Sequence, residues 1–430
     1  MIGFLRTCIV FILTWEARLV LARYAPKVIA VTGSVGKTTT KDAIYAALSG
    51  ELHMRKSQKS FNSEIGVPLT ILGLENAWNN PLKWLENIVR GALTIIFRSE
   101  YPEWLVLEVG ADRPGDIQKI AKWLKPDVVV FTGVPEIPAH VEYFPSPESL
   151  MREKRSLAEH LKTGGKLILN GDEVRTRELQ SRFRGASITF GLNDNNDFYS
   201  SHAEVAYDPD IPSGIRFRVN RNGASVPISI SGALGTPRIY AALAALAVGE
   251  TVGVDLVTVA KGLAEWTPPP GRVRILKGVN DSIIIDDTYN SSPSAVIAAL
   301  DTLKGVKAKR RIAILGDMLE LGRYSADAHK KAGVHAASCA DILITVGFRA
   351  RLMAQAALDA GMKEANILQY ELGESERAGK ELEPSLGSGD VVLVKGSQGI
   401  RMEKTVYEIM NDKELAEELL VRMDAEWRYR

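Results

Sequence analysis

The chain has 430 residues, of which 46% are hydrophobic and 24% charged, and this composition is typical of a folded protein long enough for two or three domains. Its 53 basic and 52 acidic residues leave a formal net charge of +1, so the chain has no global field that would attract nucleic acid or an anionic membrane. The two cysteines, Cys8 and Cys339, suit neither a disulfide framework nor a paired-thiolate metal site, which favours a reducing, cytoplasmic compartment.

The first segment, residues 1–27, is strongly apolar and is expected to form a helix. Its apolar part, residues 2–15, is shorter than the roughly 20 residues of a spanning helix and is interrupted by Arg6, and no small-residue cleavage site follows it. The sequence therefore predicts neither a transmembrane helix nor a signal peptide. Two interpretations stay open: a helix that packs against its own domain or another subunit, and an interfacial helix that brings residues 1–25 to the inner face of a membrane.

Short apolar runs recur along the rest of the chain, and most end in Gly, Asp or Asn. The runs are residues 28–33, 104–110, 127–133, 166–172, 283–287, 311–317, 341–347 and 391–396. Runs that are apolar throughout indicate parallel strands buried on both faces, and helical stretches fall between them. We therefore expect an α/β fold with mostly parallel sheets. Ligands of such sheets bind beyond the carboxyl ends of the strands.

Three segments depart from this pattern. Residues 75–103 are predicted to be a helical insertion, and residues 194–232 alternate around an Asn-Gly pair, which predicts an antiparallel excursion. The segment EWTPPPGR (265–272) contains three consecutive prolines, which cannot continue a helix and form a stiff connector. The main domain boundary is expected there, between a domain of residues 28–270 and one of residues 271–430.

The sequence VIAVTGSVGKTTTKDAIYAALSG predicts a phosphate-binding loop between a buried strand and a helix. Gly33 and Gly36 let backbone N–H groups turn toward phosphate oxygens, Lys37 supplies a positive charge, and Thr38 stands where a hydroxyl can hold Mg²⁺. The strict P-loop pattern would have glycine at position 31, where this chain has Val31. An ordinary glycine turn before a helix is the plain alternative, but the combination of features favours ATP or GTP binding.

The loop TGSVGKTTT resembles the nucleotide loop of the Mur ligase family, the ATP-dependent amide ligases of peptidoglycan synthesis, with folylpolyglutamate and cyanophycin ligases as relatives. Further motifs match in order over residues 28–410. They are SFNSEIGVPLTIL (60–72), LEVGADRPGDI (107–117), AHVEYFPSPESLMREK (139–154), DDTYNSSPSA (286–295), GDMLELG (316–322) and VKGSQGIRME (395–403). The set is most similar to the branch that adds D-alanyl-D-alanine to a muramoyl tripeptide. The resemblance implies that ATP activates a carboxylate as an acyl phosphate, which an amine then captures.

The resemblance also implies the fold, a P-loop central domain with a mostly parallel sheet and a C-terminal Rossmann-like α/β domain, and roles for individual residues. The expected nucleotide contacts are Gly33, Ser34, Val35, Gly36, Lys37, Thr38, Thr39, Arg272, Asp287 and Asn290. The expected Mg²⁺ ligands are Thr38, Glu108, His140 and a carbamylated Lys154, and Glu142 is a further candidate; Lys37, Glu108, His140 and Lys154 form the catalytic group. The expected contacts of the two joined substrates, the muramoyl peptide and D-alanyl-D-alanine, are Asn62, Glu64, Asp317, Glu320, His329, Lys395, Ser397 and Arg401.

Two departures from the family pattern bear on the substrates. The phosphate loop begins by residue 33, so we expect a member without the usual N-terminal domain that binds the uridine nucleotide. The segment GTPRIYAALAAL (235–246) has Pro237, Arg238 and Ala241 where the family commonly has histidine and asparagines that recognise adenine. The open alternatives are a ligase of the folylpolyglutamate or cyanophycin type, and a non-catalytic nucleotide-binding scaffold for wall-precursor enzymes. A monomer without nucleic-acid partners is expected.

Overall fold

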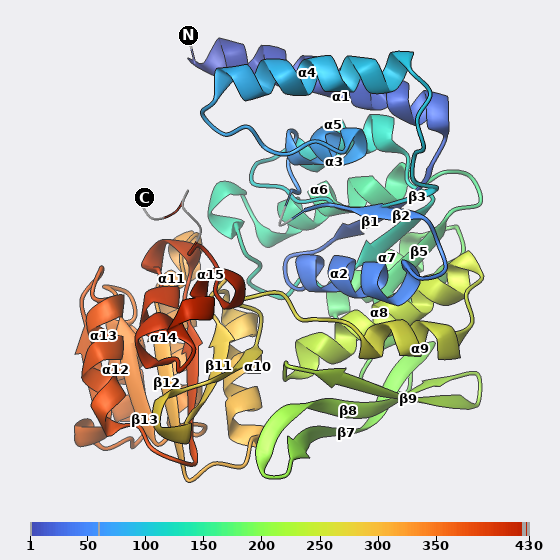
Figure 1. Ribbon diagram of the computed structural model, residues 1–430. Coiled ribbons are helices and arrows are strands. Elements are labelled where there is room, and N and C mark those ends of the chain that lie inside the picture. The colour runs from blue at the N-terminus through green and yellow to red at the C-terminus, as the bar shows by residue number, and fades with distance from the viewer. Residues whose placement is uncertain (1, 59–60, 424–426, 428–430) are drawn as a thin grey trace.

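The computed structural model describes residues 2–58, 61–423 and 427, and it contains two sheets with helices on their faces (Figure 1). The first sheet has nine strands in the order β2-β3-β1-β4-β5-β6-β7-β8-β9. Their bounds are β1 Lys27–Thr32, β2 Met54–Lys56, β3 Trp104–Glu108, β4 Val128–Phe131, β5 Lys166–Asn170, β6 Ser187–Gly191, β7 Phe198–Asp208, β8 Ile211–Arg221 and β9 Ala224–Ser231. Strands β2 to β7 pair in parallel, whereas β7, β8 and β9 form the antiparallel excursion that the sequence predicts.

Two layers of helices cover this sheet because alternate residues of its strands face opposite sides. Ile29 and Val31 of β1 belong to the core under α2 (Lys37–Leu48), α8 (Thr236–Val252) and α9 (Leu256–Ala264). Val28 and Ala30 face the opposite core. The helices on that side are α1 (Ile2–Tyr24), α3 (Gly66–Leu72), α5 (Asp116–Leu124), α6 (Pro147–Glu159) and α7 (Val174–Arg182).

The second sheet has six strands in the order β10-β11-β15-β12-β13-β14, and all neighbours except β10 and β11 are parallel. The strands are β10 Arg274–Lys277, β11 Ile283–Asp287, β12 Arg310–Gly316, β13 Ile342–Val346, β14 Ile367–Tyr370 and β15 Asp390–Lys395. One face packs on α10 (Pro293–Gly305), α11 (Ser325–Ala337) and α12 (Arg351–Asp359), and the other on α13 (Ser375–Leu382), α14 (Glu403–Ile409) and α15 (Ala416–Leu419). The chain crosses between the sheets through the proline-rich segment 265–272, which has neither helix nor strand.

The N-terminal helix α1 packs against α3 and against α4 (Pro81–Ile96), the helix of the predicted insertion. Leu13, Ala17 and Val20 are fully buried in this packing, so α1 does pack against its own domain. In Figure 1, α1 and α4 run side by side as the outermost layer over the first sheet. None of the helices in the described ranges is long and apolar enough to cross a membrane.

Candidate active site

The phosphate loop follows β1, which lies between β3 and β4 at the point where the strand order reverses. Gly33 has φ +145° and a Cβ there would collide with the Thr132 hydroxyl, while Gly36 has φ +83°. Only glycine fits both positions without strain. The Ser34 N–H donates to the Gly133 carbonyl at 2.7 Å and Thr132 Oγ1 donates to the Val35 carbonyl at 2.5 Å, so the end of β4 fixes the loop.

Two lysines converge on one carbonyl oxygen of this loop. Lys37 Nζ donates to the Gly33 carbonyl at 3.1 Å, and Lys154 Nζ donates to the same oxygen at 2.9 Å. Lys154 reaches it from α6, where Ser146 and Ser149 form a capping box at the first turn. Burial lowers the pKa of Lys37, and burial together with the charge of Lys37 lowers the pKa of Lys154 well below its usual value.

Glu108, the last residue of β3, is 1% exposed and lies beside the loop. Its Oε2 accepts from Thr38 Oγ1 at 2.9 Å, and its Oε1 accepts from Asn62 Nδ2 at 3.2 Å. A carboxylate buried this deeply is costly unless it binds donors or a cation. The hydroxyl and carboxylate oxygens gathered here are the ligands that Mg²⁺ prefers, so the residues present fit that ion.

The C-terminal domain supplies the facing side of the site. Arg272 Nη2 donates to Thr38 Oγ1 at 3.2 Å, and its guanidinium stacks 3.9 Å from the centre of the Tyr289 ring. From the ends of β15 and β11, Lys395 Nζ pairs with Asp287 Oδ2 at 2.6 Å and donates to the Asn290 carbonyl at 2.9 Å. The carboxyl ends of the two sheets therefore face each other.

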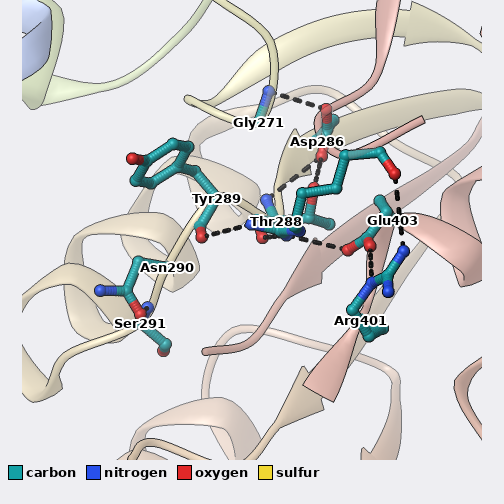
Figure 2. Close-up of polar contacts among 9 residues, drawn as sticks. Gly271, Asp286, Thr288, Tyr289, Asn290, Ser291, Arg401 and Glu403 are labelled. Atoms are coloured by element: carbon teal, nitrogen blue, oxygen red, sulfur yellow. Dashed lines mark hydrogen bonds and ion pairs between the residues drawn. The ribbon is translucent and has the colours of Figure 1, made fainter. Parts of the chain in front are cut away.

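A buried carboxylate ties the linker to the loop after β11, as Figure 2 shows. Asp286 accepts from the Gly271 N–H at 3.0 Å and from the Thr288 hydroxyl at 2.6 Å, and burial raises its pKa to about 6. These bonds hold the linker next to Arg272 and the start of the loop that carries Asn290, and both of these residues line the cavity.

A cavity of about 610 Å³ lies between the two sets of strand ends. Its lining includes Ser34, Val35, Gly36, Lys37, Thr38, Thr39, Asn62, Glu108, His140, Arg272, Asp287, Asn290 and Lys395. Several buried donors on its wall have no hydrogen-bond partner within the described part of the chain: Ser34 Oγ, Arg238 Nε and Nη1, Arg272 Nε, Ser291 Oγ and Ser294 Oγ. Unsatisfied buried donors are costly, so this set fits a ligand rich in acceptor oxygens.

His140 lines the cavity at its edge toward the C-terminal domain, and other predicted residues lie outside the lining. His140 Nδ1 lies 2.5 Å from Glu320 Oε2, and the Glu142 N–H donates to the Glu320 carbonyl at 3.3 Å, so the two domains meet here. The contact with His140 lowers the pKa of Glu320. Glu64 pairs with Arg6 of α1 at 3.4 Å and is absent from the cavity lining.

The remaining predicted residues lie within the C-terminal domain and are bonded to its own groups. Asp317 Oδ1 accepts from the Ala350 N–H at 2.6 Å, and His329 Nε2 accepts from the Met318 N–H at 3.0 Å. Ser397 Oγ accepts from the Leu319 N–H at 2.9 Å. Arg401 pairs with Glu403, away from the cavity lining (Figure 2).

Sequence reasoning missed several residues of the cavity wall. Thr132 directly follows β4, and Asn170 is the last residue of β5. Asn170 Nδ2 donates to the Thr132 carbonyl at 2.9 Å. The rule about strand ends applies to both, so that signal was available. Arg238 is 1% exposed and stacks 5.0 Å from the Trp266 ring centre, and burial lowers its pKa to about 9. Its place on the cavity wall could not be derived from its helical spacing.

A parallel strand, a glycine loop, a lysine at a helix N-terminus and a second α/β domain over them define a nucleotide-dependent enzyme of the phosphate-loop class. The Mur ligase middle domain matches residues 31–249, and the Mur ligase, glutamate ligase domain matches residues 271–398. The chain belongs to the Mur ligase family.

Two relatives of this chain share one name. A UDP-N-acetylmuramoyl-tripeptide--D-alanyl-D-alanine ligase of Bacillus subtilis (strain 168) is 29% identical over 398 residues, covering 92% of this chain and 78% of the relative. The protein of that name from Escherichia coli (strain K12) is 27% identical over 88% of this chain and 76% of its own. Among solved structures, the MurF ligase from Thermotoga maritima in complex with ADP has a TM-score of 0.76 and 26% identity, covering 95% of this chain and 84% of that one.

Proposed function

We propose that this chain is an ATP-dependent amide ligase that activates a carboxylate as an acyl phosphate and joins it to an amine. One observation carries the proposal: the phosphate loop and Arg272 of the C-terminal domain meet at Thr38, on the wall of a cavity with unpartnered donors. Residues 28–270 and 271–430 are proposed as the two domains that close over the substrates. The relatives' names and the ADP-bound neighbour support this assignment.

Amide formation from a carboxylate requires that the carboxylate be activated first. A carboxylate is a poor acylating agent because its oxygen is a poor leaving group in water. The carboxylate oxygen attacks the γ-phosphorus of ATP, ADP leaves, and the amine then attacks the acyl carbon and expels phosphate with loss of a proton. Protein groups contribute by positioning and by charge, since phosphoryl transfer leaves little covalent work to the enzyme.

The nucleotide would lie along the loop, with its phosphates on the N–H groups of residues 33–39. Lys37 of the phosphate loop and Arg272 of the C-terminal domain would stabilise the charge of the transferring phosphoryl group. Asp287 and Asn290 of the C-terminal domain would contact the nucleotide from across the cavity. Closure excludes water that would otherwise hydrolyse the acyl phosphate.

Thr38, Glu108, His140 and a modified Lys154 would hold Mg²⁺, which neutralises phosphate charge when bound. Lys154 is 2% exposed and lies beside a second ammonium group, that of Lys37. Its neutral amine would attack CO₂, forming a carbamate and releasing a proton. The product is an anion that can bind a cation, which an ammonium group cannot.

Carbamylation has a direct test. Lys154→Ala should lose activity by at least about 100-fold and recover part of it with a small added carboxylate such as acetate. The wild-type enzyme incubated with ¹³C-bicarbonate should show a carbamate signal by NMR that this variant lacks. Lys119→Ala, at an exposed position on α5, is the matched control. Full activity of Lys154→Ala would overturn the role.

The proposed substrates are a UDP-N-acetylmuramoyl tripeptide, as the carboxylate, and D-alanyl-D-alanine, as the amine. Asn62 and Glu64 are proposed on the muramoyl side, next to the phosphate loop. Lys395 lies on the cavity wall and is proposed to contact the dipeptide, with Glu320 at the domain contact. Four more residues of the C-terminal domain are proposed to act around the dipeptide: Asp317, His329, Ser397 and Arg401. The first three would do so through the loop after β12.

The decisive experiment measures phosphate release with ATP and each substrate alone and together, followed by mass spectrometry of the product. Turnover that needs both substrates, and a product carrying the added dipeptide, supports the proposal. Product formation with glutamate as the amine would instead place the chain with the folylpolyglutamate type. Nucleotide binding without amide product would make it a scaffold. The enzyme is proposed to act as a cytoplasmic monomer, which sedimentation velocity tests.

A further inference from the structure

Helices α1 and α4 carry an unusual concentration of exposed apolar side chains. Half of the large hydrophobic side chains that are exposed in the described residues lie on or next to these two helices. We call the following set the α1–α4 surface: Leu5, Phe11, Trp15, Leu82, Leu85, Val89, Leu93 and Ile96, with Trp78 and Phe97 flanking α4. A concentration of this kind marks an interaction site rather than ordinary protein surface.

The exposed residues of α4 follow helical spacing. Leu82, Leu85, Val89, Leu93 and Ile96 recur every three or four positions, so they form one stripe along the helix. Leu82 is 76% exposed and Ile96 is 65% exposed, so the stripe is open at both ends.

A different face of α4 packs on the protein. Asn87 and Gly91 are buried, and Trp84, Ile88 and Ile95 pack against the core that contains Leu13, Ala17 and Val20 of α1. Helix α4 therefore has two apolar faces, and the fold covers one of them.

The charges around the stripe are basic. Arg18, Arg23, Lys83 and Arg90 are exposed on the two helices, as is Arg6, which pairs with Glu64. Glu86 is the single exposed acid among the described residues of α1 and α4, and it lies 3.7 Å from Arg90. Two copies of this surface placed face to face would bring like charges together, which disfavours a homodimer.

We propose that the α1–α4 surface binds an anionic lipid bilayer, with the apolar stripe in the headgroup and acyl boundary and the basic side chains on lipid phosphates. Interfacial helices combine these features: an apolar face with leucine and aromatic residues, basic residues beside it, and no spanning segment. Helices α1 and α4 form the outer layer in Figure 1, and neither contributes to the cavity lining, so the bilayer would not cover the active site. This inference goes beyond the ligase activity and does not depend on it.

The test is sedimentation of the full chain with vesicles. Phosphatidylcholine vesicles containing phosphatidylglycerol should bind the wild type at least about tenfold more strongly than pure phosphatidylcholine vesicles. The double variant Leu85→Glu/Val89→Glu should weaken binding at least about tenfold, because it places two charges in the stripe. Both side chains are half exposed, at 59% and 50%, so the variant should keep the wild-type melting temperature.

Val257→Glu/Ile211→Glu is the matched control, because these side chains are equally exposed, at 56% and 51%, but lie on α9 and β8. It should bind vesicles as the wild type does. Lys83→Glu/Arg90→Glu should lose the preference for anionic vesicles. Equal binding by Leu85→Glu/Val89→Glu and the wild type would overturn the proposal. So would vesicle-independent self-association that this variant abolishes, since the surface would then belong to a second copy.

Discussion

At the scale of single residues, Lys37 is partly buried and carries a charge that the proposed reaction needs. Lys37→Ala should reduce the rate of phosphate release by at least about 100-fold, because one preorganised donor at the transferring group is worth that much. Its melting temperature should stay close to that of the wild type, and Lys119→Ala should keep full activity. A near-normal kcat in Lys37→Ala would refute the assignment of the phosphate loop.

Glu16 is a second buried ionisable residue, 2% exposed on α1, and burial raises its pKa from 4.5 to about 7. Between these values the folded chain holds a proton that the unfolded chain has released. Stability should therefore fall as pH rises from 4.5 to 7 and level off above 7. Glu16→Gln should remove this loss, gaining about 3 kcal/mol at pH 8 relative to the wild type and little at pH 4.

Denaturant unfolding across this pH range measures the effect, with Glu86→Gln on α4 as the exposed control. The free energy of unfolding of the control should follow the wild type at every pH. Parallel pH profiles for Glu16→Gln and the wild type would contradict the raised pKa.

At the scale of elements, the contact of α1 with α4 depends on Gly91. A Cβ at this position would collide with the carboxylate of Glu16. Gly91→Ala should therefore destabilise the chain by about 1 kcal/mol, because overpacking outweighs the gain in helix propensity. In a Glu16→Ala background the same substitution should instead stabilise by up to about 1 kcal/mol. A double-mutant cycle measured by denaturant unfolding would show no coupling if the two helices did not meet here.

The sequence predicts the elements well because burial on both faces leaves a local signal. Continuous apolar runs mark the parallel strands, and Asn222-Gly223, both at positive φ, turns β8 into β9 as expected. Lys37 follows from the glycine loop between a strand and a helix, and Glu108 at the end of β3 follows from the family resemblance. Contacts between distant segments leave no such signal. His140 and Glu320, which both have positive φ, form a pair across the two domains, and Arg238 stacks on Trp266.

At the scale of the whole molecule, several polar contacts between described residues join the two domains beside the cavity. The His140–Glu320 pair is one of them. Close to this pair, a Cβ built on Gly322 would lie 3.5 Å from Glu142, so the two loops are in near contact. Glu320→Gln should raise the KM for ATP about threefold to tenfold and increase the radius of gyration in solution, because the closed state loses about 1 kcal/mol. Kinetics and small-angle X-ray scattering measure the two effects.

Asp301→Asn provides the control for this prediction. Asp301 pairs with His335 at 2.7 Å in a similar geometry, but both residues belong to the C-terminal domain. This variant should leave the KM and the radius of gyration unchanged. Identical behaviour of the two variants would show that the contact across the domains does not govern closure.

The burial of α1 also has a practical consequence for anyone who prepares this protein. An apolar N-terminus invites deletion as a remedy for poor solubility. Leu13, Ala17 and Val20 share their core with Val28 and Ala30 of β1, the strand that leads into the phosphate loop. Deleting about the first 24 residues would expose the side chains of that strand that face α1. The shortened chain should therefore aggregate more readily and bind nucleotide more weakly than the intact one.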